Sequence, residues 1–320
     1  MVDIDGSTDG RIPFVAIIVL NYNGNTDTFE CLNSLHKIGY KNFRIYLVDN
    51  GSTEAIENEV VIRFPDIKFI GNNSNLGFTG GNNVGCKAAI TDGADYVLLL
   101  NNDTVVDAYF LDYLVAECEK DNRIGMATSK IYFYGQDRVL WAYGAKIDRL
   151  SARSPHIGVY EYDDCKYDYI KEVDRITGCA MLVGREVIDK IGMLDDRFFI
   201  YEEELDWCIR ARKAGYKLVV VPNSIIWHKG HRDAGRIGRP FIAYLQTRNH
   251  FLLLRKHSGF FHLQGTIALI YAFIAVIKSI LIACMFMLIN RERKYLTYIK
   301  AVVLGVIDSF RGVFGKPSRF

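Results

Sequence analysis

One short stretch, Tyr96–Thr104, constrains the fold more than any other: an unbroken apolar run that stops at Asn-Asn-Asp. Its apolar part, Tyr96–Leu100, is typical of a strand buried on both faces of a parallel sheet. Ligands of open α/β sheets lie beyond the carboxyl ends of strands, so Asp103 is expected to project into that crevice. A carboxylate beside two amides can hold a hard divalent cation. A plain turn or helix cap is the alternative.

Other segments in the first 120 residues also alternate between strand and helix patterns. The strand-like runs are Phe14–Leu20, Phe43–Val48 and Ile67–Ile70, and the helical segments are Thr26–Ile38, Thr53–Phe64, Asn82–Ile90 and Ala108–Lys120. This alternation predicts βαβ units and an α/β fold with a mostly parallel central sheet. Polar loops follow Leu20, Val48 and Leu100, and we expect all three along one edge of that sheet.

Asp49 follows the second predicted strand, in Asp-Asn-Gly-Ser-Thr. An acidic residue there can accept hydrogen bonds from a ribose or a base, as in nucleotide-binding α/β folds. A helix N-cap or an Asx-turn explains the same residue equally well.

A glycine- and asparagine-rich loop, Asn72–Gly85, leads into a predicted helix. Its four glycines would let the backbone approach a ligand, and a helix N-terminus suits phosphate. The loop lacks the spacing of a dinucleotide fingerprint and the lysine of a P-loop.

Residues 134–170 are rich in tyrosine and charged side chains, which predicts long loops. The segment Arg175–Gly184 after them is predicted to be a further strand.

Three adjacent carboxylates, Glu202 to Glu204, open a predicted helix that ends at Gly215. Acidic residues favour a helix N-terminus, so a structural explanation exists. Mutual repulsion of the three would instead raise at least one pKa, as a general base requires. The spacing of Asp206 and Arg210 predicts an i,i+4 ion pair.

His228 ends a further strand-like region, Lys217–Val221 and then Ser224–His228. Its imidazole could bind a metal or a phosphate, or could be an ordinary loop histidine.

Charge is unevenly distributed along the chain. From Lys229 onward there are 15 Lys and Arg against 3 Asp and Glu, whereas the preceding residues carry 24 against 34. Within this basic tail, 21 of the 23 residues of Ile267–Ile289 are apolar. Its helical length, about 34 Å, could cross a bilayer core of about 30 Å. A basic, apolar tail indicates an anionic membrane surface more than nucleic acid.

Lys278 near the midpoint and basic residues on both flanks favour a monotopic or re-entrant segment over a single span. A buried pair of soluble helices is the third possibility. Val302–Val313 predicts a second, amphipathic surface helix. We therefore expect two domains, residues 1–240 and a helical membrane-associating extension over 241–320.

The seven cysteines form no Cys-x-x-Cys pair. They are expected to be buried free thiols of a reducing compartment and not a disulfide framework or a zinc site. The polar first ten residues and the short run after them do not resemble a signal peptide. Both points predict a cytoplasmic body, at the cytoplasmic face of the cell membrane.

Five segments in order resemble a known family: Ile17–Gly24, Val48–Thr53, Asn75–Gly85, Leu99–Thr104 and Tyr201–Trp207. The chain is similar to family-two inverting glycosyltransferases of GT-A fold, especially their rhamnosyltransferase-like branch, over about residues 13–240.

The resemblance implies a nucleotide-activated sugar as donor and roles for individual residues. Asp49 would contact the nucleoside, and Asp103 would be the metal-binding carboxylate of an Asp-x-Asp position whose first member is Asn101 here. His228 would approach the metal or the diphosphate, with Mg²⁺ or Mn²⁺ as the ion. The other donor-side residues would be Asn21, Asn75, Gly77, Gly81, Asn83 and Asn102.

Glu203-Glu204 matches the family's Glu-Asp pair, which implies Glu204 as the base and Glu203 as the alternative one residue back. A single displacement with one base inverts the anomeric carbon, and the acceptor would be a glycan or a lipid-linked glycan. Two other functions stay open: a nucleotidyltransferase that makes nucleotide sugars, and a non-catalytic module that binds a sugar or a partner.

Overall fold

The computed structural model describes residues 11–230, 239–261 and 263–317. Its strands are β1 Val15–Asn21, β2 Phe43–Asp49, β3 Lys68–Gly71, β4 Tyr96–Asn101, β5 Thr104–Val106, β6 Ile124–Phe133, β7 Leu140–Ala142, β8 Lys171–Glu172, β9 Ala180–Gly184 and β10 Lys217–His228. Its helices are α1 Asn25–Leu35, α2 Glu57–Arg63, α3 Gly77–Thr91, α4 Phe110–Lys120, α5 Arg185–Ile191, α6 Glu203–Lys213, α7 Pro240–Lys256, α8 Ser258–Phe261, α9 Leu263–Asn290 and α10 Lys294–Arg311.

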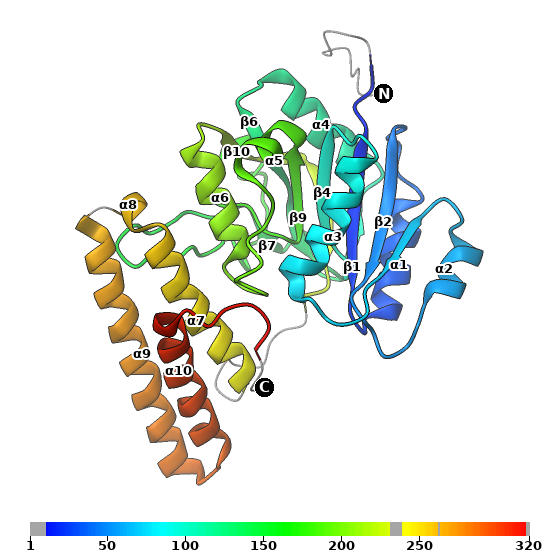
Figure 1. The fold of residues 1–320 in the computed structure, drawn as a ribbon. Coiled ribbons are helices and arrows are strands. Elements are labelled where there is room, and N and C mark those ends of the chain that lie inside the picture. The colour runs from blue at the N-terminus through cyan, green and yellow to red at the C-terminus, as the bar shows by residue number, and fades with distance from the viewer. Residues whose placement is uncertain (1–10, 231–238, 262, 318–320) are drawn as a thin grey trace. The chain divides into compact units, whose positions relative to one another are not determined.

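These strands form one mixed sheet, in which eight follow the order β3-β2-β1-β4-β9-β6-β10-β5 (Figure 1). β7 pairs with β6 and β8 with β10. The first four strands of that order are parallel, whereas β9 is antiparallel to both β4 and β6. The predicted α/β fold is confirmed, but the sheet is mixed and not mostly parallel, because β9, β5, β7 and β8 pair antiparallel with their neighbours.

Each face of the sheet has its own apolar core because successive side chains of a strand point to opposite faces. Val15, Ile17 and Val19 pack with residues of α1 and α4, while Ala16 and Ile18 pack with residues of α3, α5 and α6. Every residue of β1 except Leu20 is fully enclosed. Burial on both faces is the reason that the sequence of this strand does not alternate.

The chain folds as two compact units. The first contains the residues up to Lys146, Pro155–Leu194 and Trp207–Gly230, and the second contains Ile147–Ser154, Asp195–Asp206 and the chain after Gly230. The first turn of α6 thus belongs to the second unit. Division into functional domains at residue 240 stays a prediction.

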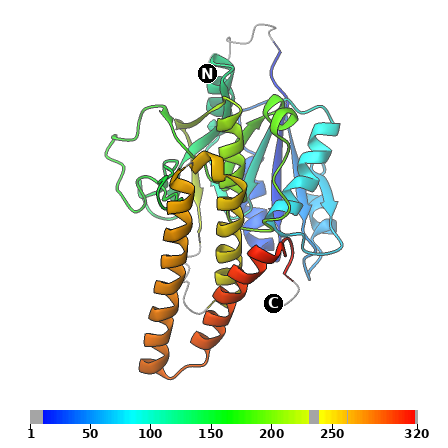
Figure 2. The same cartoon turned by 60° about the vertical axis from the view of Figure 1, so that its left-hand side comes forward.

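The second unit contains three long helices, α7, α9 and α10, in contact with one another (Figures 1 and 2). α7 and α10 lie in close contact at Gly305, where an added Cβ would lie 2.7 Å from the carbonyl oxygen of Tyr244. Ala243, Ala283 and Val302 complete this small core. Part of α9, Thr266–Asn290, is long and apolar enough to cross a membrane, with a mean hydropathy of 2.6, and it is mostly exposed within its unit.

All seven cysteines are free thiols, as predicted, but Cys165 is exposed and Cys284 is half-buried. Burial raises the pKa of Cys31 to about 12, so this thiol stays protonated.

Some predicted boundaries were wrong. α2 begins at Glu57 and not at Thr53, and β9 begins at Ala180 and not at Arg175. α3 begins at Gly77, five residues before the predicted start, so half of the predicted glycine loop is helical.

Candidate active site

The ends of β1, β2 and β4 bring the predicted donor residues to one edge of the sheet. In the strand register, Asn21 lies opposite Asp49, and Leu20 lies opposite Asn101. Parallel neighbours end on the same side, so the polar loops after all three strands share that edge. We call Asn21, Asp49, Asn102, Asp103 and His228 the strand-end cluster.

Asp49 is held from two sides and is only 8% exposed. One of its carboxylate oxygens accepts hydrogen bonds from Asn21 Nδ2 at 2.8 Å and Ser52 Oγ at 2.6 Å, and the other from the Ser52 amide at 3.1 Å. The Ser52 amide lies three residues on from Asp49, whereas an Asx-turn uses the amide two residues on, so the alternative of an Asx-turn is wrong. The next helix, α2, begins only at Glu57, so Asp49 is not a helix N-cap either. Asn21 itself is fully buried, which gives it a positioning role toward Asp49.

Asn50, which the sequence analysis missed, organises the segment before α3. Its side-chain nitrogen donates to the Gly77 carbonyl oxygen at 3.0 Å and to Asn75 Oδ1 at 3.1 Å. Asn75 Oδ1 in turn accepts the Gly77 amide at 2.7 Å. Gly51, between Asp49 and this segment, has φ +74°, and an added Cβ would lie 2.7 Å from the Ser74 backbone. The backbone geometry at this position therefore requires the glycine of the Asp-Asn-Gly sequence.

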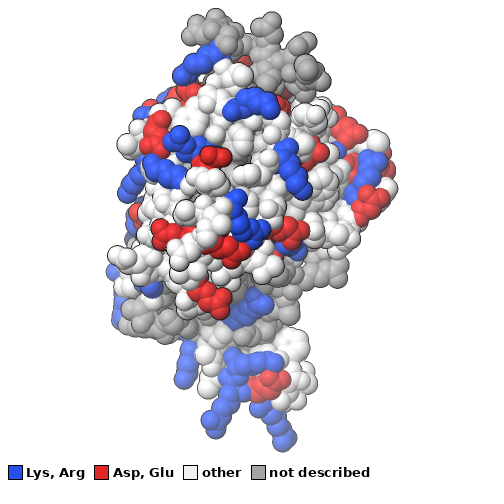
Figure 3. Space-filling model, turned by 90° about the vertical axis from the view of Figure 1, so that its right-hand side faces the viewer, with Lys and Arg blue, Asp and Glu red and all other residues white. Residues whose placement is uncertain are grey.

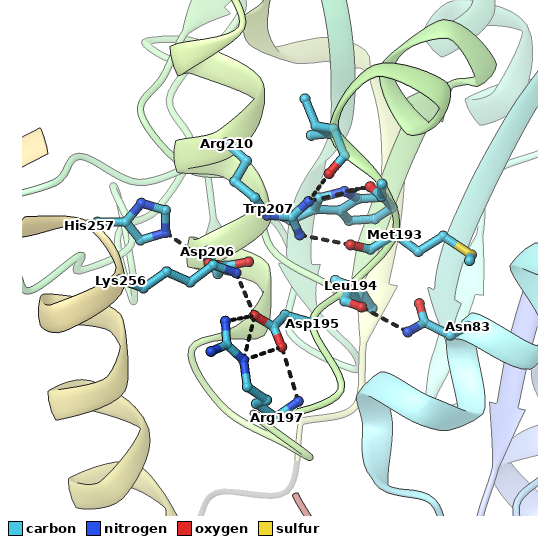
Figure 4. Close-up of polar contacts among 12 residues, drawn as sticks. Asn83, Met193, Leu194, Asp195, Arg197, Asp206, Trp207, Arg210, Lys256 and His257 are labelled. Carbon is cyan, nitrogen blue, oxygen red and sulfur yellow. Dashed lines mark hydrogen bonds and ion pairs between the residues drawn. The ribbon is translucent and has the colours of Figure 1, made fainter. Parts of the chain in front are cut away.

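Two glycines within α3 are required for the packing of this helix. A Cβ on Gly81 would lie 2.5 Å from the Leu20 side chain, and one on Gly85 would lie 2.5 Å from Ile18. These glycines let α3 lie directly on β1. Asn83, also in α3, donates to the Leu194 carbonyl oxygen at 2.8 Å (Figure 4) and so holds the loop after α5.

Asp103 and His228 are brought together from distant parts of the chain. Asp103 Oδ1 lies 3.1 Å from His228 Nε2, and the Lys229 amide donates to the Asp103 carbonyl oxygen at 3.0 Å. The pairing of β5 with the end of β10 produces this contact, because Thr104 lies opposite His228. Asn102 points to α1, where it donates to Thr28 Oγ1 at 2.9 Å.

Trp141 fixes the plane of the His228 ring. Its ring centre lies 4.5 Å from that of His228 in an edge-to-face arrangement and 4.9 Å from that of His156. Burial lowers the pKa of His156 to about 3, so this histidine is neutral and adds no positive charge at neutral pH.

Asp103 and His228 supply two ligands of the kinds that Mg²⁺ and Mn²⁺ accept. No group of three or more His, Cys, Asp or Glu side chains within the described residues could hold a metal by itself. The pair therefore fits an ion whose other ligands come from a phosphate-bearing substrate and water.

Glu203 and Glu204 begin α6, as predicted, while Glu202 precedes the helix. Glu203 is only 4% exposed, but Glu204 is half-buried and keeps accessible surface. Glu202 Oε1 lies 3.4 Å from His250 Nδ1.

Asp206 has partners that helical spacing did not predict. It is fully buried, and its Oδ1 lies 2.8 Å from His257 Nε2 and 2.7 Å from Lys256 Nζ (Figure 4). Arg210 donates to the carbonyl oxygens of Ile191 at 2.6 Å and Met193 at 2.8 Å. The i,i+4 pair of Asp206 with Arg210 stays a prediction, and the contacts of Asp206 with Lys256 and His257 hold the start of α6 against the end of α7.

We expect Asp206→Asn to lower the free energy of unfolding by about 1–3 kcal/mol, because a buried charge-assisted contact with Lys256 and His257 is weakened. Urea denaturation at pH 7 measures this change. Asp189→Asn is a matched control, since it breaks an exposed i,i+4 pair with Arg185 and should cost only a few tenths of a kcal/mol. Equal shifts in the two variants would contradict the buried role.

Comparison with known families decides the class of protein. The model of the family described as "Glycosyl transferase family 2" matches residues 16–192, more than half of the chain. The chain belongs to glycosyl transferase family 2. The match includes Asp49, the segment before α3 and Asp103, and the alternatives of a nucleotidyltransferase and a non-catalytic module are set aside.

Relatives of this family 2 glycosyltransferase span nearly its whole length. A low-salt glycan biosynthesis hexosyltransferase of Haloferax volcanii is 24% identical over 95% of this chain and 94% of the relative. An N-acetylglucosaminyl-diphospho-decaprenol L-rhamnosyltransferase of Mycobacterium tuberculosis is 23% identical over 79% of this chain and 90% of the relative.

A solved structure shares the fold of this glycosyltransferase. It is a mannosyltransferase from Pyrobaculum calidifontis in complex with GDP-mannose and Mn²⁺, with a TM-score of 0.55 and 13% identity. The superposition covers 94% of this chain and 88% of the other. The GT-A fold predicted from the sequence is thereby confirmed.

Proposed function

We propose that this family 2 glycosyltransferase is metal-dependent and moves a hexose, of rhamnose type or another, from a nucleotide sugar to a glycan or lipid-linked glycan, with inversion. The observation that carries the proposal is the Asp103–His228 pair, 3.1 Å apart at the strand edge that also bears Asp49. A cation ligand pair and a buried, oriented carboxylate at one edge suit the diphosphate and the nucleoside of such a donor.

On the donor side, Asp49 would accept hydrogen bonds from the nucleoside, with its orientation set by Asn21 and Ser52. The segment Asn75–Gly77 would line the pocket. Asn21, Gly81 and Asn83 would act through packing and orientation, because each is buried and contacts other parts of the protein. The GDP-mannose in the structure from Pyrobaculum calidifontis supports this donor class.

Asp103 and His228 would hold the divalent ion, Mg²⁺ or Mn²⁺, and Asn102, just after β4, would belong to the donor side, with its side chain held by Thr28 of α1. When bound, such an ion stabilises the negative charge that develops on the leaving diphosphate. The Trp141 ring keeps the His228 imidazole in one plane, and the backbone bond from Lys229 holds Asp103 in place. The Mn²⁺ in the structurally similar mannosyltransferase supports this assignment.

Glu204 would be the general base that removes the proton from the attacking acceptor hydroxyl. Its side chain is half-buried and keeps accessible surface, whereas Glu203 is nearly enclosed. This difference favours Glu204 over the neighbouring residue. With one base and one displacement, the product has the opposite anomeric configuration.

The acceptor is proposed to be a glycan carried on a lipid, at the cytoplasmic face of the cell membrane. The name of the mycobacterial relative describes a lipid-diphosphate-linked sugar. One side of α9 exposes Ile270, Ile274, Ile277, Leu281 and Leu288. The turn from α9 to α10 exposes Arg291, Arg293 and Lys294, and Figure 3 shows basic side chains at this end of the helical unit. Apolar surface beside basic side chains suits an anionic lipid surface.

The path of the chain favours a monotopic or re-entrant helix pair over a single span. After α9 the chain turns through charged residues and returns as α10, which packs on α7 and α9. The Gly315 carbonyl oxygen then accepts a hydrogen bond from Arg248 of α7, so the segment after α10 returns to the helix that precedes α9. A helix pair lying in the interface keeps Lys278 and the basic turn in contact with water and headgroups.

Attachment is tested by the double variant Ile277→Glu, Leu281→Glu. Each exposed side chain would contribute about 1.5–3 kcal/mol on burial in lipid, so losing both should weaken vesicle binding by at least about 100-fold. Flotation with vesicles that contain phosphatidylglycerol measures the bound fraction. Ile62→Glu, at a position 80% exposed on α2, is the control and should bind like the wild type. Unchanged flotation of the double variant would contradict attachment through α9.

The proposed reaction itself is tested by incubating the purified protein with nucleotide sugars, Mn²⁺ or Mg²⁺, and lipid-linked or free glycan acceptors. Release of a nucleoside diphosphate with transfer of the sugar, lost on addition of EDTA, is the expected result. Full transfer in EDTA would contradict the metal-dependent form. A product with retained anomeric configuration would contradict the single displacement.

A further inference from the structure

The segment that leads into α6 has an unusual backbone. Phe199, Tyr201 and Glu202 have φ values of 66°, 74° and 71°, in the left-handed region that residues with a Cβ avoid. We call residues 198–202 the base loop, because Glu203 and Glu204 follow it directly. Each left-handed residue of this type costs about 1–2 kcal/mol, so such a loop persists only where its surroundings hold it.

Asn249 of α7 supplies contacts that hold the loop. Its side-chain nitrogen lies 2.8 Å from the carbonyl oxygens of Phe198 and Ile200 and 2.9 Å from that of Tyr201. Asn249 is fully buried. The side-chain amide of Asn249 thus donates to three carbonyl oxygens of the base loop. These hydrogen bonds satisfy carbonyl groups that burial would otherwise leave without a partner.

Arg248, the preceding residue, orients Asn249 and closes the arrangement. Its Nε donates to Asn249 Oδ1 at 3.0 Å, which directs the amide nitrogen of Asn249 toward the loop. Its terminal nitrogens donate to the carbonyl oxygens of Phe198 at 3.1 Å and Gly315 at 2.8 Å. Arg248 is also fully buried, and its planar fork suits several fixed acceptors at once.

We propose that Asn249, oriented by Arg248, is a positioning residue for the transfer reaction: it fixes the base loop and therefore the place and direction of Glu204. The inference rests on the proposed function, in which Glu204 removes the acceptor proton. Asn249 touches neither substrate in this scheme and acts only through the backbone. A base displaced by about 1 Å can lose roughly 100-fold in rate, so the effect of Asn249 should be large and confined to the transfer step.

The test compares Asn249→Ala with Tyr244→Phe. Tyr244 lies in the same helix and loses one buried hydrogen bond, to Asp308 at 2.8 Å, while phenylalanine keeps the aromatic ring that packs beside Arg248 and Phe199. Hydrogen exchange of the peptide over residues 198–206 reports on the loop, and titration with nucleoside diphosphate and Mn²⁺ reports on the donor side. The transfer rate at saturating donor and acceptor completes the set.

For Asn249→Ala we expect exchange at least about 10-fold faster in this peptide, a donor affinity within about 2-fold of wild type, and a kcat lower by roughly 10–100-fold. Tyr244→Phe should keep its kcat within about 2-fold. The inference is overturned if Asn249→Ala keeps a normal kcat, or if Tyr244→Phe loses as much.

If Asn249→Ala does not fold, Arg248→Lys decides by the same measurements, because it keeps the charge and loses the fork that orients Asn249. A wild-type protein without any transfer activity would refute the proposed function instead. The exchange data would then still decide whether Asn249 orders the base loop, so the two failures are distinguishable.

Discussion

Replacing Glu204 by glutamine is expected to lower the transfer rate at saturating donor by about 10²–10⁴-fold, the usual contribution of a general base. Glutamine keeps the size of the side chain and its place in the first turn of α6, but it does not accept the proton of an acceptor hydroxyl. The affinity for the donor should barely change, because the base acts on the acceptor.

The neighbouring glutamate is the control for this assignment. Glu203→Gln should reduce the rate less, since Glu203 is 4% exposed and has little surface for a substrate. Rates of transfer for both variants, with thermal unfolding to check the fold, are the deciding measurements. Near-normal turnover in Glu204→Gln would refute its role, and a collapse in Glu203→Gln alone would move the role one residue back.

Asp103→Ala should abolish the part of donor binding that depends on Mn²⁺ or Mg²⁺. The substitution removes one of the two proposed metal ligands and leaves a lone imidazole, so we expect at least about a 100-fold loss in metal-dependent affinity. The fold should survive, because the bond from the Lys229 amide goes to the backbone of Asp103. Calorimetry with a nucleoside diphosphate, with and without Mn²⁺, measures the effect.

Two further variants sharpen this test. Asp66→Ala removes an exposed carboxylate in the same unit and should bind like the wild type. His228→Gln removes the partner ligand, and a loss similar to that of Asp103→Ala is expected if both hold one ion. Unchanged metal-dependent binding in Asp103→Ala would refute the proposed metal site.

The parallel half of the sheet could be predicted because burial on both faces leaves a direct signal in the sequence. The apolar runs of β1, β2 and β4 need no alternation, and each stops at the polar residues that form the strand-end cluster. The type and order of these elements were therefore correct, and boundaries moved by only one or two residues at β1 and β4.

Contacts between distant segments could not be predicted in this way. The sequence does not indicate that Gly81 and Gly85 of α3 lie against Leu20 and Ile18 of β1, because this approach exists only in the packed structure. Asp206 has an arginine at helical spacing, but its contacts with Lys256 and His257, fifty residues on, leave no signal in the local sequence. Helical periodicity describes neighbours along one helix and carries no information about which other helix will pack there.

The bond of Gly315 to Arg248 has a consequence for the order in which the protein matures. The Gly315 amide also donates to the Arg197 carbonyl oxygen at 2.8 Å, so the segment before the base loop is bonded to a residue made much later. At about 5–20 residues per second, on the order of ten seconds separate the synthesis of the two. A nascent chain can form the strand-end cluster early, yet the segment before the proposed base gains this bond only after Gly315 has been made. Under the proposed function, a chain that has not yet reached Gly315 would bind its donor without transferring the sugar.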